Sequence, residues 1–436
     1  MILIIGAGLA GLSTAYHLGS EDYQIYEKEA NVGGLCRSYE KDGFTFDYTG
    51  HLLHVKNDYT SLLLKKILPH TLTPHRRRAS IYSKGVLTPY PFQANLYKLP
   101  KDVIKKCLTG FIEAREMREG ALTGKVQPQN RSGCSFKDWI LTMFGKGIAE
   151  HFMVPYNEKL WRRDLGELSS EWVDWSIPLP TLDEVVGGAL GLENEHMGYS
   201  AQFLYPEAGG IGLLPQAFLP HISTLQCNRS LTAIDLKEKR AWFDDGESVH
   251  YDSLVSTVPL PELIDMIRDV PSRIAEMRRG LQHISVLDVN IGITGDVISD
   301  QHWIYFPEPE FPFYRAGFYS HFSRSLAPPK TTSLYVEVSY LPENPLHNHD
   351  VQRKVYDGLR ACGILPEGDQ VIVEDVVDIP YAYVIYDHFR QQNLPKIIDY
   401  LEGNSIFSIG RYGSWEYMSM EDTLLQGKKV AEALHG

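Results

Sequence analysis

The sequence has 436 residues, of which 43% are hydrophobic and 22% are charged. This composition is ordinary for a globular protein, and the length exceeds what one small core accommodates, so we expect about two or three lobes. The formal net charge of −13 argues against a general nucleic-acid binder, because no broad positive field attracts phosphates. A local basic pocket for one anionic ligand remains compatible with this charge.

The five cysteines are scattered and form no C-x-x-C pair, which predicts neither a disulfide framework nor a zinc site. They are Cys36, Cys107, Cys134, Cys227 and Cys362. The apolar start has no basic segment before it, and no apolar run is long enough to cross a bilayer. We therefore expect a cytoplasmic protein without a membrane span.

The N-terminal stretch predicts a dinucleotide-binding turn. An apolar run at 2–5 leads into G-x-G-x-x-G, with Gly6, Gly8 and Gly11 in place, and a small-residue helix follows. Gly6 permits the tight turn, Gly8 lets a pyrophosphate approach the backbone, and Gly11 allows close packing of helix and strand. The helix N-terminus then offers unpaired N–H groups to the phosphates.

A second strand is expected at 23–26 and ends in Glu27, at the spacing of a ribose-binding carboxylate. The following loop carries Gly33, Gly34 and Arg37, which suit a segment passing close to a diphosphate. This loop resembles the second motif of flavoproteins that bind FAD as amine oxidases and protoporphyrinogen oxidase do. The resemblance favours FAD over a nicotinamide cofactor alone.

Two histidines and a basic run follow. His51, directly after Gly50, is expected beside the isoalloxazine, whereas His54 is expected to be an interior imidazole. Without a nearby carboxylate or cysteine cluster, the two histidines do not predict a metal site. The basic run at 75–80 is either a solvated strand end or an anion contact.

The pattern along the chain predicts an α/β fold with a Rossmann-like FAD-binding domain, a helical insert and a substrate-side antiparallel sheet. We place the FAD-binding domain at 1–60, 206–260 and 400–436, the mostly helical insert at 61–205, and the sheet domain at 261–399. Helices are expected at 101–119, 135–152 and up to residue 434, and strands at 284–293 and 332–340. The glycine-rich stretch 187–191 is expected to be a mobile loop.

Several more particular segments resemble the UDP-galactopyranose mutase family, closer to its eukaryotic type, and the likeness covers nearly the whole chain. They are Tyr-Pro-Phe-Gln at 90–93, Pro-Tyr-Asn at 155–157 with Trp161, Trp-Ile-Tyr-Phe-Pro at 303–307, Phe-Tyr-Arg at 313–315, and Gly-Arg-Tyr-Gly-Ser-Trp at 410–415 with Tyr417.

The resemblance implies roles for individual residues. Around the substrate it places Tyr90, Phe92 and Gln93 near a uracil, Asn157, Trp161, Trp303 and Tyr305 beside the ligand, Arg315 on the diphosphate, and the hydroxyls of Tyr381 and Tyr417 on the same group. Around the flavin it places His51, Gly410, Arg411 and either Arg77 or Arg78. The catalytic set it implies is His51, Tyr305, Arg315, Tyr381 and Tyr417.

Two positions depart from the family pattern. A second diphosphate-binding arginine is replaced by Ser176, and an asparagine after Tyr417 is replaced by Glu421 or its neighbour Asp422. A lost charge-assisted contact typically costs ~1.5–3 kcal/mol. An uncompensated carboxylate near the diphosphate would add to that loss.

Three functional hypotheses follow. The first is a mutase that interconverts pyranose and furanose forms of a nucleotide sugar without net oxidation, with N5 of reduced FAD as the nucleophile at the anomeric carbon and NADPH or NADH as reductant. The second is an FAD-dependent oxidase or desaturase of the amine oxidase or protoporphyrinogen oxidase type. The third is a flavin-bound scaffold protein of a polysaccharide pathway. The expected partner is a small nucleotide sugar, and a monomer and a small homo-oligomer are both open.

Overall fold

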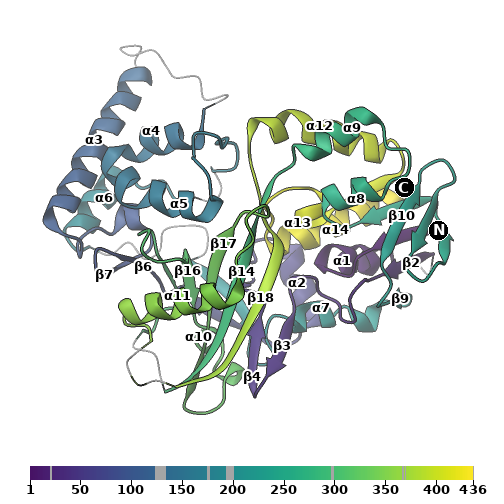
Figure 1. The fold of residues 1–436 in the computed structure, drawn as a ribbon, viewed down its shortest axis with the longest axis horizontal. Coiled ribbons are helices and arrows are strands. Elements are labelled where there is room, and N and C mark those ends of the chain that lie inside the picture. The colour runs from purple at the N-terminus through teal and green to yellow at the C-terminus, as the bar shows by residue number, and fades with distance from the viewer. Residues whose placement is uncertain are drawn as a thin grey trace.

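The computed structural model describes residues 1–19, 22–122, 134–173, 177–192, 201–295, 299–365, 368 and 370–435. Figure 1 shows a group of helices, α3 to α6, on one side, a large sheet in the middle, and a second sheet wrapped by helices on the other side, where both chain ends lie. The predicted α/β class, with helices and several sheets, is confirmed.

The sheet near the chain ends has five parallel strands in the order β19-β13-β1-β2-β9. The strands are Ile2–Ile5 (β1), Tyr23–Tyr26 (β2), Leu225–Gln226 (β9), Ser253–Ser256 (β13) and Ile406–Ser408 (β19). Helix α1 (Leu9–Leu18) follows β1, and α14 (Met420–His435) packs closely on it, since a Cβ on Gly427 would lie 2.6 Å from the carbonyl oxygen of Ala10. Segments from the beginning, middle and end of the sequence therefore share one core.

The central sheet has seven strands in the order β18-β14-β17-β16-β15-β6-β7. The strands are Val371–Val384 (β18), His283–Thr294 (β14), Thr331–Tyr340 (β17), Arg315–Gly317 (β16), Trp303–Tyr305 (β15), Ala79–Ser83 (β6) and Val86–Pro89 (β7). Every neighbouring pair is antiparallel except β15 and β6. The apolar side of α11 (Asn348–Ala361) covers one face of this sheet, and the strands predicted at 284–293 and 332–340 are confirmed.

The helical group contains the predicted helices at 101–119 and 135–152, with some differences in extent. They are α3 (Lys101–Leu122), α4 (Phe136–Ile148), a π-helical turn (Ala149–Met153), α5 (Val154–Trp161) and α6 (Leu182–Ala189). The segment predicted as mostly helical also holds β5 (Leu72–Arg76) and β8 (Gln202–Pro206), which pair with each other, and β6 and β7, which extend the central sheet.

The prediction of a mobile loop at 187–191 is wrong for most of this stretch. Residues 187–189 form the last turn of α6, which begins with a capping box between Thr181 and Glu184. Gly188 lies against the backbone of the short helical turn Phe92–Ala94, because a Cβ there would lie 1.8 Å from the carbonyl oxygen of Ala94. The glycine provides close packing rather than mobility.

The other described elements connect these parts. They are Ser38–Lys41 (β3), Phe44–Asp47 (β4), Asp58–Ile67 (α2), Leu213–Gln216 (α7), Leu231–Asp235 (β10), Arg240–Phe243 (β11), Ser248–His250 (β12), Leu260–Met266 (α8), Ser272–Arg279 (α9), Tyr319–Phe322 (α10), His388–Glu402 (α12) and Gly410–Gly413 (α13). Among the described residues, no helix has both the length and the apolar character needed to cross a bilayer.

Candidate active site

A cavity of about 790 Å³ runs between the parallel sheet and the central sheet. This volume lies within the range of roughly 300–1,000 Å³ that is usual for ligand pockets. Most of the residues predicted from the sequence line it, and they are Gly6, Gly8, Glu27, Gly33, Gly34, Arg37, Gly50, His51, Trp303, Tyr305, Arg315, Tyr381, Gly410, Arg411 and Tyr417. One cavity therefore brings together the predicted cofactor residues and part of the predicted substrate residues.

The turn between β1 and α1 forms one end of the cavity. Gly6 has a φ of 97°, in the region that favours glycine, and a Cβ there would lie 2.0 Å from Oγ1 of Thr257. Gly8 precedes α1 and faces Gly34, whose Cα would lie 3.9 Å from a Cβ on Gly8. No side chain caps the N-terminus of α1, so its first N–H groups are available to an anion.

Glu27 lies beside this turn with a largely buried side chain. Its carboxylate accepts hydrogen bonds from the backbone N–H of Ala7 at 2.7 Å and of Glu29 at 2.9 Å. The carboxylate lines the cavity, and an ionised carboxylate has further lone pairs that suit the hydroxyls of a ribose. Gly11 does not line the cavity, because it packs against the backbone of Gly6 with 2.0 Å between its Cβ position and the Gly6 oxygen.

The loop at 48–51 forms the middle of the cavity wall. Burial, and next the charge of Arg411, lowers the pKa of His51 to about 4, so the imidazole is neutral at physiological pH. Nδ1 of His51 and Nε of Arg37 are buried without a hydrogen-bond partner among the described residues. Gly50 lies tightly on the central sheet, since a Cβ there would meet the hydroxyl of Tyr335 at 2.1 Å.

These features fit FAD. The glycine turn and the free end of α1 suit a diphosphate, Glu27 suits a ribose, and the partnerless nitrogen atoms of His51 and Arg37 suit polar groups of a ligand in the cavity. The N-terminal end of α14 also reaches the cavity through Met420 and Thr423.

Arg315 lies on the central-sheet side of the cavity, on β16. Its Nε and Nη2 donate to the carboxylate of Glu337 on β17, with 2.6 Å between Nη2 and Oε1. Glu337 is almost fully buried and lies opposite both Arg315 and Asp288 on β14 in the strand register. Burial, and next the nearby Glu337, raises the pKa of Asp288 well above its usual range.

Aromatic side chains surround Arg315 in two groups. In the first, the ring of Tyr305 lies 5.5 Å from Tyr90 and 5.5 Å from Tyr156. In the second, Tyr383 and Tyr417 stack in parallel at 6.2 Å, and the guanidinium carbon of Arg411 lies 5.0 Å and 4.2 Å from their ring centres. Cation–π contact with Arg411 therefore stabilises this pair of tyrosines.

Tyr383 is a cavity residue that the sequence reasoning missed. Tyr381, the residue predicted from the family pattern, also lines the cavity, but its ring lies 4.3 Å from His283 and 6.0 Å from Trp415. Tyr383 lies two positions further along β18 and stacks on Tyr417. The register of β18 against β14 shifts between Ile379 and Tyr383, so simple alternation along the strand does not identify the second tyrosine.

Five of the predicted substrate residues do not line the cavity. Tyr90 contacts Arg77, whose guanidinium carbon lies 4.5 Å from the ring centre. Phe92 is fully buried and stacks on Phe152 at 4.9 Å, and Gln93 donates from Nε2 to the carbonyl of Pro178 at 2.7 Å. Phe92 and Gln93 are core residues of the helical group, whereas Tyr90 is half-buried and contacts Arg77 and Tyr305.

Asn157 and Trp161 complete that set. Asn157 donates to the carbonyl of Met153 within its own helical segment at 2.8 Å. Trp161 packs against Trp172 at 5.3 Å and reaches the site indirectly, since its ring lies 5.8 Å from Tyr383. Neither residue is on the cavity surface.

Of the two arginines that the sequence left open for the flavin side, Arg77 is buried, whereas Arg78 is 46% exposed and donates to the backbone oxygen of Asp300 at 2.7 Å. The guanidinium of Arg77 lies over the ring of Tyr90, and Arg77 does not line the cavity. Ser176 lies outside the described residues.

The two acids that replace the family's asparagine both have partners within the protein. Glu421 does not line the cavity and accepts from the backbone N–H of Lys56 at 3.1 Å and of Asn57 at 2.9 Å, at the start of α2. Asp422 accepts from Ser419 at the start of α14. Both carboxylates therefore accept hydrogen bonds at helix N-termini, where negative charge is favourable.

The family of flavin containing amine oxidoreductases matches residues 9–435. The chain belongs to this family. Together with the glycine turn, Glu27 and the orphaned nitrogen atoms, membership of the flavin containing amine oxidoreductases supports FAD as the cofactor.

Among solved structures, the chain is similar to a reduced UDP-galactopyranose mutase, with a TM-score of 0.93 and 28% identity over 100% of this chain and 93% of that one. Among curated proteins, it is 48% identical over 48 residues to a 4,4'-diapophytoene desaturase of Staphylococcus aureus strain bovine RF122 / ET3-1, which is 11% of this chain and 10% of the relative. It is 24% identical over 282 residues to the coproporphyrinogen III oxidase of Staphylococcus aureus strain NCTC 8325 / PS 47, which is 59% of this chain and 60% of that protein. The match thus spans about a tenth of the desaturase and about three fifths of the oxidase.

Proposed function

We propose that this chain is an FAD-dependent mutase that interconverts the pyranose and furanose forms of a nucleotide sugar without net oxidation. The observation that carries the proposal is its likeness, over its whole length, to the reduced UDP-galactopyranose mutase. When bound in reduced form, the flavin supplies N5 as a nucleophile toward the anomeric carbon of the sugar. NADPH or NADH is the expected reductant.

The residues of the cavity suit the departure of a nucleoside diphosphate. Arg315 and Arg411 place two guanidinium groups on the cavity wall, and Tyr305, Tyr383 and Tyr417 supply aromatic surface and hydroxyl groups around them. Negative charge develops on the leaving diphosphate, and donors fixed in a partly buried site stabilise it. Because Glu337 fixes the plane of Arg315, this donor is oriented before the ligand arrives.

The neutral His51 lines the cavity, and its buried Nδ1 makes no hydrogen bond within the described residues. A neutral imidazole can donate from one nitrogen atom and accept at the other. We assign His51 to hold and orient the cofactor ring, because its low pKa leaves it uncharged across the physiological range.

The test is a conversion assay with the purified holoprotein. After anaerobic reduction with dithionite, the protein is given a panel of UDP- and TDP-sugars, and pyranose and furanose forms are separated by chromatography. We expect conversion of at least one sugar with reduced protein and none with oxidised protein. The absence of any conversion across the panel would overturn the proposal.

A matched pair of variants sharpens this assay. Arg315→Lys keeps the charge but loses the planar fork, so kcat/KM should fall by at least about tenfold. Arg353→Lys, in an exposed ion pair with Asp350 on α11 and outside the cavity lining, should leave kcat/KM unchanged. Equal effects of both variants would contradict the role of Arg315.

A flavin oxidase or desaturase is the second candidate. Two observations favour it: the match to coproporphyrinogen III oxidase over 59% of this chain, and the neutralisation of Arg315 by Glu337, which weakens attraction of a dianion. Hydride would then pass from the substrate to oxidised FAD. Peroxide release with oxidised protein, without any need for dithionite, would select this function. Tight FAD binding without reactivity in either assay would point to a flavin-bound scaffold.

A further inference from the structure

We propose that Arg390 is a positioning residue for Tyr417, and that its ion pair with Glu171 ties the placement of Tyr417 to the helical group of the protein. Any effect on ligand binding rests on the proposed function, in which Tyr417 contacts the nucleotide diphosphate. The mechanical part of the inference does not rest on it.

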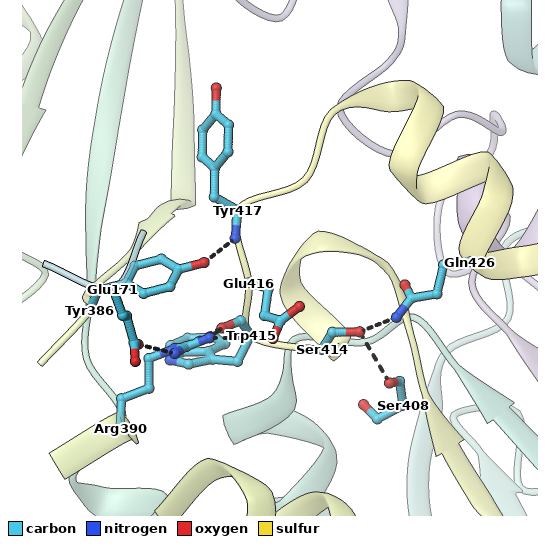
Figure 2. Close-up of polar contacts among 9 residues, drawn as sticks. All are labelled: Glu171, Tyr386, Arg390, Ser408, Ser414, Trp415, Glu416, Tyr417 and Gln426. Atoms are coloured by element: carbon cyan, nitrogen blue, oxygen red, sulfur yellow. Dashed lines mark hydrogen bonds and ion pairs between the residues drawn. The ribbon is translucent and has the colours of Figure 1, made fainter. Parts of the chain in front are cut away.

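Arg390 lies in the first turn of α12, with its side chain only 6% exposed and outside the cavity lining. Its Nε and Nη2 donate to the backbone oxygen of Trp415 at 3.0 Å and 2.8 Å, and Nη1 donates to Oε1 of Glu171 at 2.8 Å. Figure 2 shows the guanidinium between the Trp415 backbone and Glu171. The planar fork fixes the Trp415 carbonyl in direction as well as in distance.

The Trp415 backbone needs such support. Its φ is 54°, in the left-handed region that residues with a side chain seldom adopt, and its indole ring is completely buried. This turn directs the chain out of α13, so that two residues later the side chain of Tyr417 extends away from the hydrogen-bonded group, as Figure 2 shows. Tyr417 is 37% exposed and lines the cavity.

A second connection runs beside the first one. The backbone N–H of Tyr417 donates to the hydroxyl of Tyr386 at 2.7 Å. The backbone oxygen of Tyr386 in turn accepts from the N–H of Ser169 at 2.7 Å, and the rings of Tyr386 and Trp172 lie 6.2 Å apart. The segment 169–172 therefore reaches Tyr417 both through Glu171 and Arg390 and through Ser169 and Tyr386.

The same turn is anchored to the parallel sheet from its other side. The hydroxyl of Ser414 accepts from Nε2 of Gln426 on α14 at 2.6 Å, as Figure 2 shows. The hydroxyl of Ser408, at the end of β19, donates to the oxygen of Gly413 at 2.8 Å. The turn that carries Tyr417 is thus held between the cofactor-side sheet and the helical group. Because Gln426 and Ser408 hold one side of this turn, a movement of segment 169–172 on the other side changes the position of Tyr417.

Arg390 acts through hydrogen-bond geometry rather than through charge on a ligand. Glu171 and, at 3.8 Å, Glu416 both face its guanidinium, so its charge is matched inside the protein. The sequence gives no sign of this role, because Arg390, Glu171 and Trp415 are far apart along the chain.

The experiment uses the FAD-bound protein and the variant Glu171→Gln, which keeps the size of the side chain but weakens the ion pair. Amide hydrogen exchange of residues 414–419 is compared with that of wild type. We expect exchange in this segment to rise at least about tenfold, with the FAD absorption spectrum unchanged. Arg390→Lys should raise exchange further, because it also loses the two-point contact with the Trp415 oxygen.

Asp350→Asn is the matched control, since it breaks an ion pair with Arg353 on α11 in which both side chains are mostly exposed. It should leave exchange at 414–419 as in wild type. Unchanged exchange in Glu171→Gln, or an equal rise in Asp350→Asn, would overturn the proposal. Because this readout needs no substrate, it decides the inference even if the protein has no mutase activity.

Binding of UDP, measured by calorimetry, tests the link to the ligand. Glu171→Gln should raise the Kd about three- to tenfold in a protein that has Tyr417, and should have no effect in the Tyr417→Phe background. An equal loss in both backgrounds would show that Glu171 acts on the ligand without Tyr417. Failure of wild type to bind UDP would count against the proposed function and would leave the exchange result to stand alone.

Discussion

Arg315 and Glu337 form a two-point ion pair across the neighbouring strands β16 and β17, inside the cavity. Glu337 is buried, so this pair is shielded from solvent and the position of the arginine is set before any ligand binds. The pair lies beside Asp288, a second buried acid whose pKa is raised by burial and by Glu337. Two neighbouring strands of the central sheet thereby place both the cation and its counter-charge.

Glu337→Gln should lower the stability of the protein and raise its affinity for anions. The substitution removes the counter-charge of a partly buried guanidinium, which we expect to cost about 2–4 kcal/mol in the free energy of unfolding. The released positive charge should lower the Kd of UDP. Urea unfolding and calorimetry measure the two effects, and weaker UDP binding would show that orientation of Arg315 outweighs its charge.

Glu421→Gln should reduce stability without changing the affinity for UDP. The carboxylate accepts from the backbone N–H of Lys56 and Asn57 at the start of α2, so its loss should cost about 1–2 kcal/mol. Urea unfolding and a UDP titration of the same variant measure both quantities. Tighter UDP binding by this variant would mean that the carboxylate acts on the ligand after all.

Features of the site that depend on neighbouring residues in the sequence could be predicted, whereas contacts between residues far apart in the sequence could not. The strand, glycine turn and helix at the N-terminus depend on adjacent residues, and the structure has them as predicted. The role of Glu421 depends on Lys56, which is 365 positions away, and no local pattern encodes that contact. The pairing of Arg315 with Glu337 likewise depends on the register between strands.

Burial is the other quantity that the sequence left open. Phe92 and Gln93 match the family pattern, but whether such residues face a ligand or a core depends on how the helical group packs. Gly188 shows the same limit, because a glycine in a loop and a glycine that admits a neighbouring backbone look identical in a sequence. Tyr383 was missed because its stacking on Tyr417 and its contact with Arg411 depend on distant parts of the chain.

Gly8→Ala and Gly11→Ala should separate cofactor binding from folding. The protein accepts a Cβ on Gly8, since the nearest atom would be 3.9 Å away, so this variant should fold normally and lose FAD affinity through contact with the pyrophosphate. A Cβ on Gly11 would lie 2.0 Å from the oxygen of Gly6, so this variant should lose about 1–3 kcal/mol of stability even without FAD.

Fluorescence titration with FAD and urea unfolding of the apoproteins measure these two effects. Normal FAD affinity in Gly8→Ala would contradict the assignment of this turn to the pyrophosphate. Normal stability in Gly11→Ala would contradict the close packing of α1 on the β1 turn.

The pKa of His51 predicts acid sensitivity of the apoprotein. Burial lowers this pKa from 6.5 to about 4 in the folded chain, so between these pH values the unfolded chain binds more protons. The free energy of unfolding should therefore fall as the pH drops from about 6.5 to 4, with about 2–3 kcal/mol attributable to His51. In His51→Asn, the free energy of unfolding should fall by about 2–3 kcal/mol less than in wild type over this pH range.

His283 and His302 also have lowered pKa values because of burial, so wild type and variant should share a residual slope. Only the difference between the two curves, obtained by urea unfolding at a series of pH values, reports on His51. Parallel curves would mean that His51 titrates normally in the folded apoprotein.

Gly188→Ala and Gly187→Ala are neighbours in α6 with opposite expected effects. A Cβ on Gly188 would lie 1.8 Å from the oxygen of Ala94 and 2.6 Å from its carbonyl carbon, so the helix must move away from the turn Phe92–Ala94. We expect a loss of about 2–4 kcal/mol in the free energy of unfolding. A Cβ on Gly187 would meet Leu192 at 3.5 Å, an ordinary contact, and alanine favours the helix by up to about 1 kcal/mol. Urea unfolding of both variants measures the difference, and equal stability would mean that residues 187–189 are not packed as a helix against the turn.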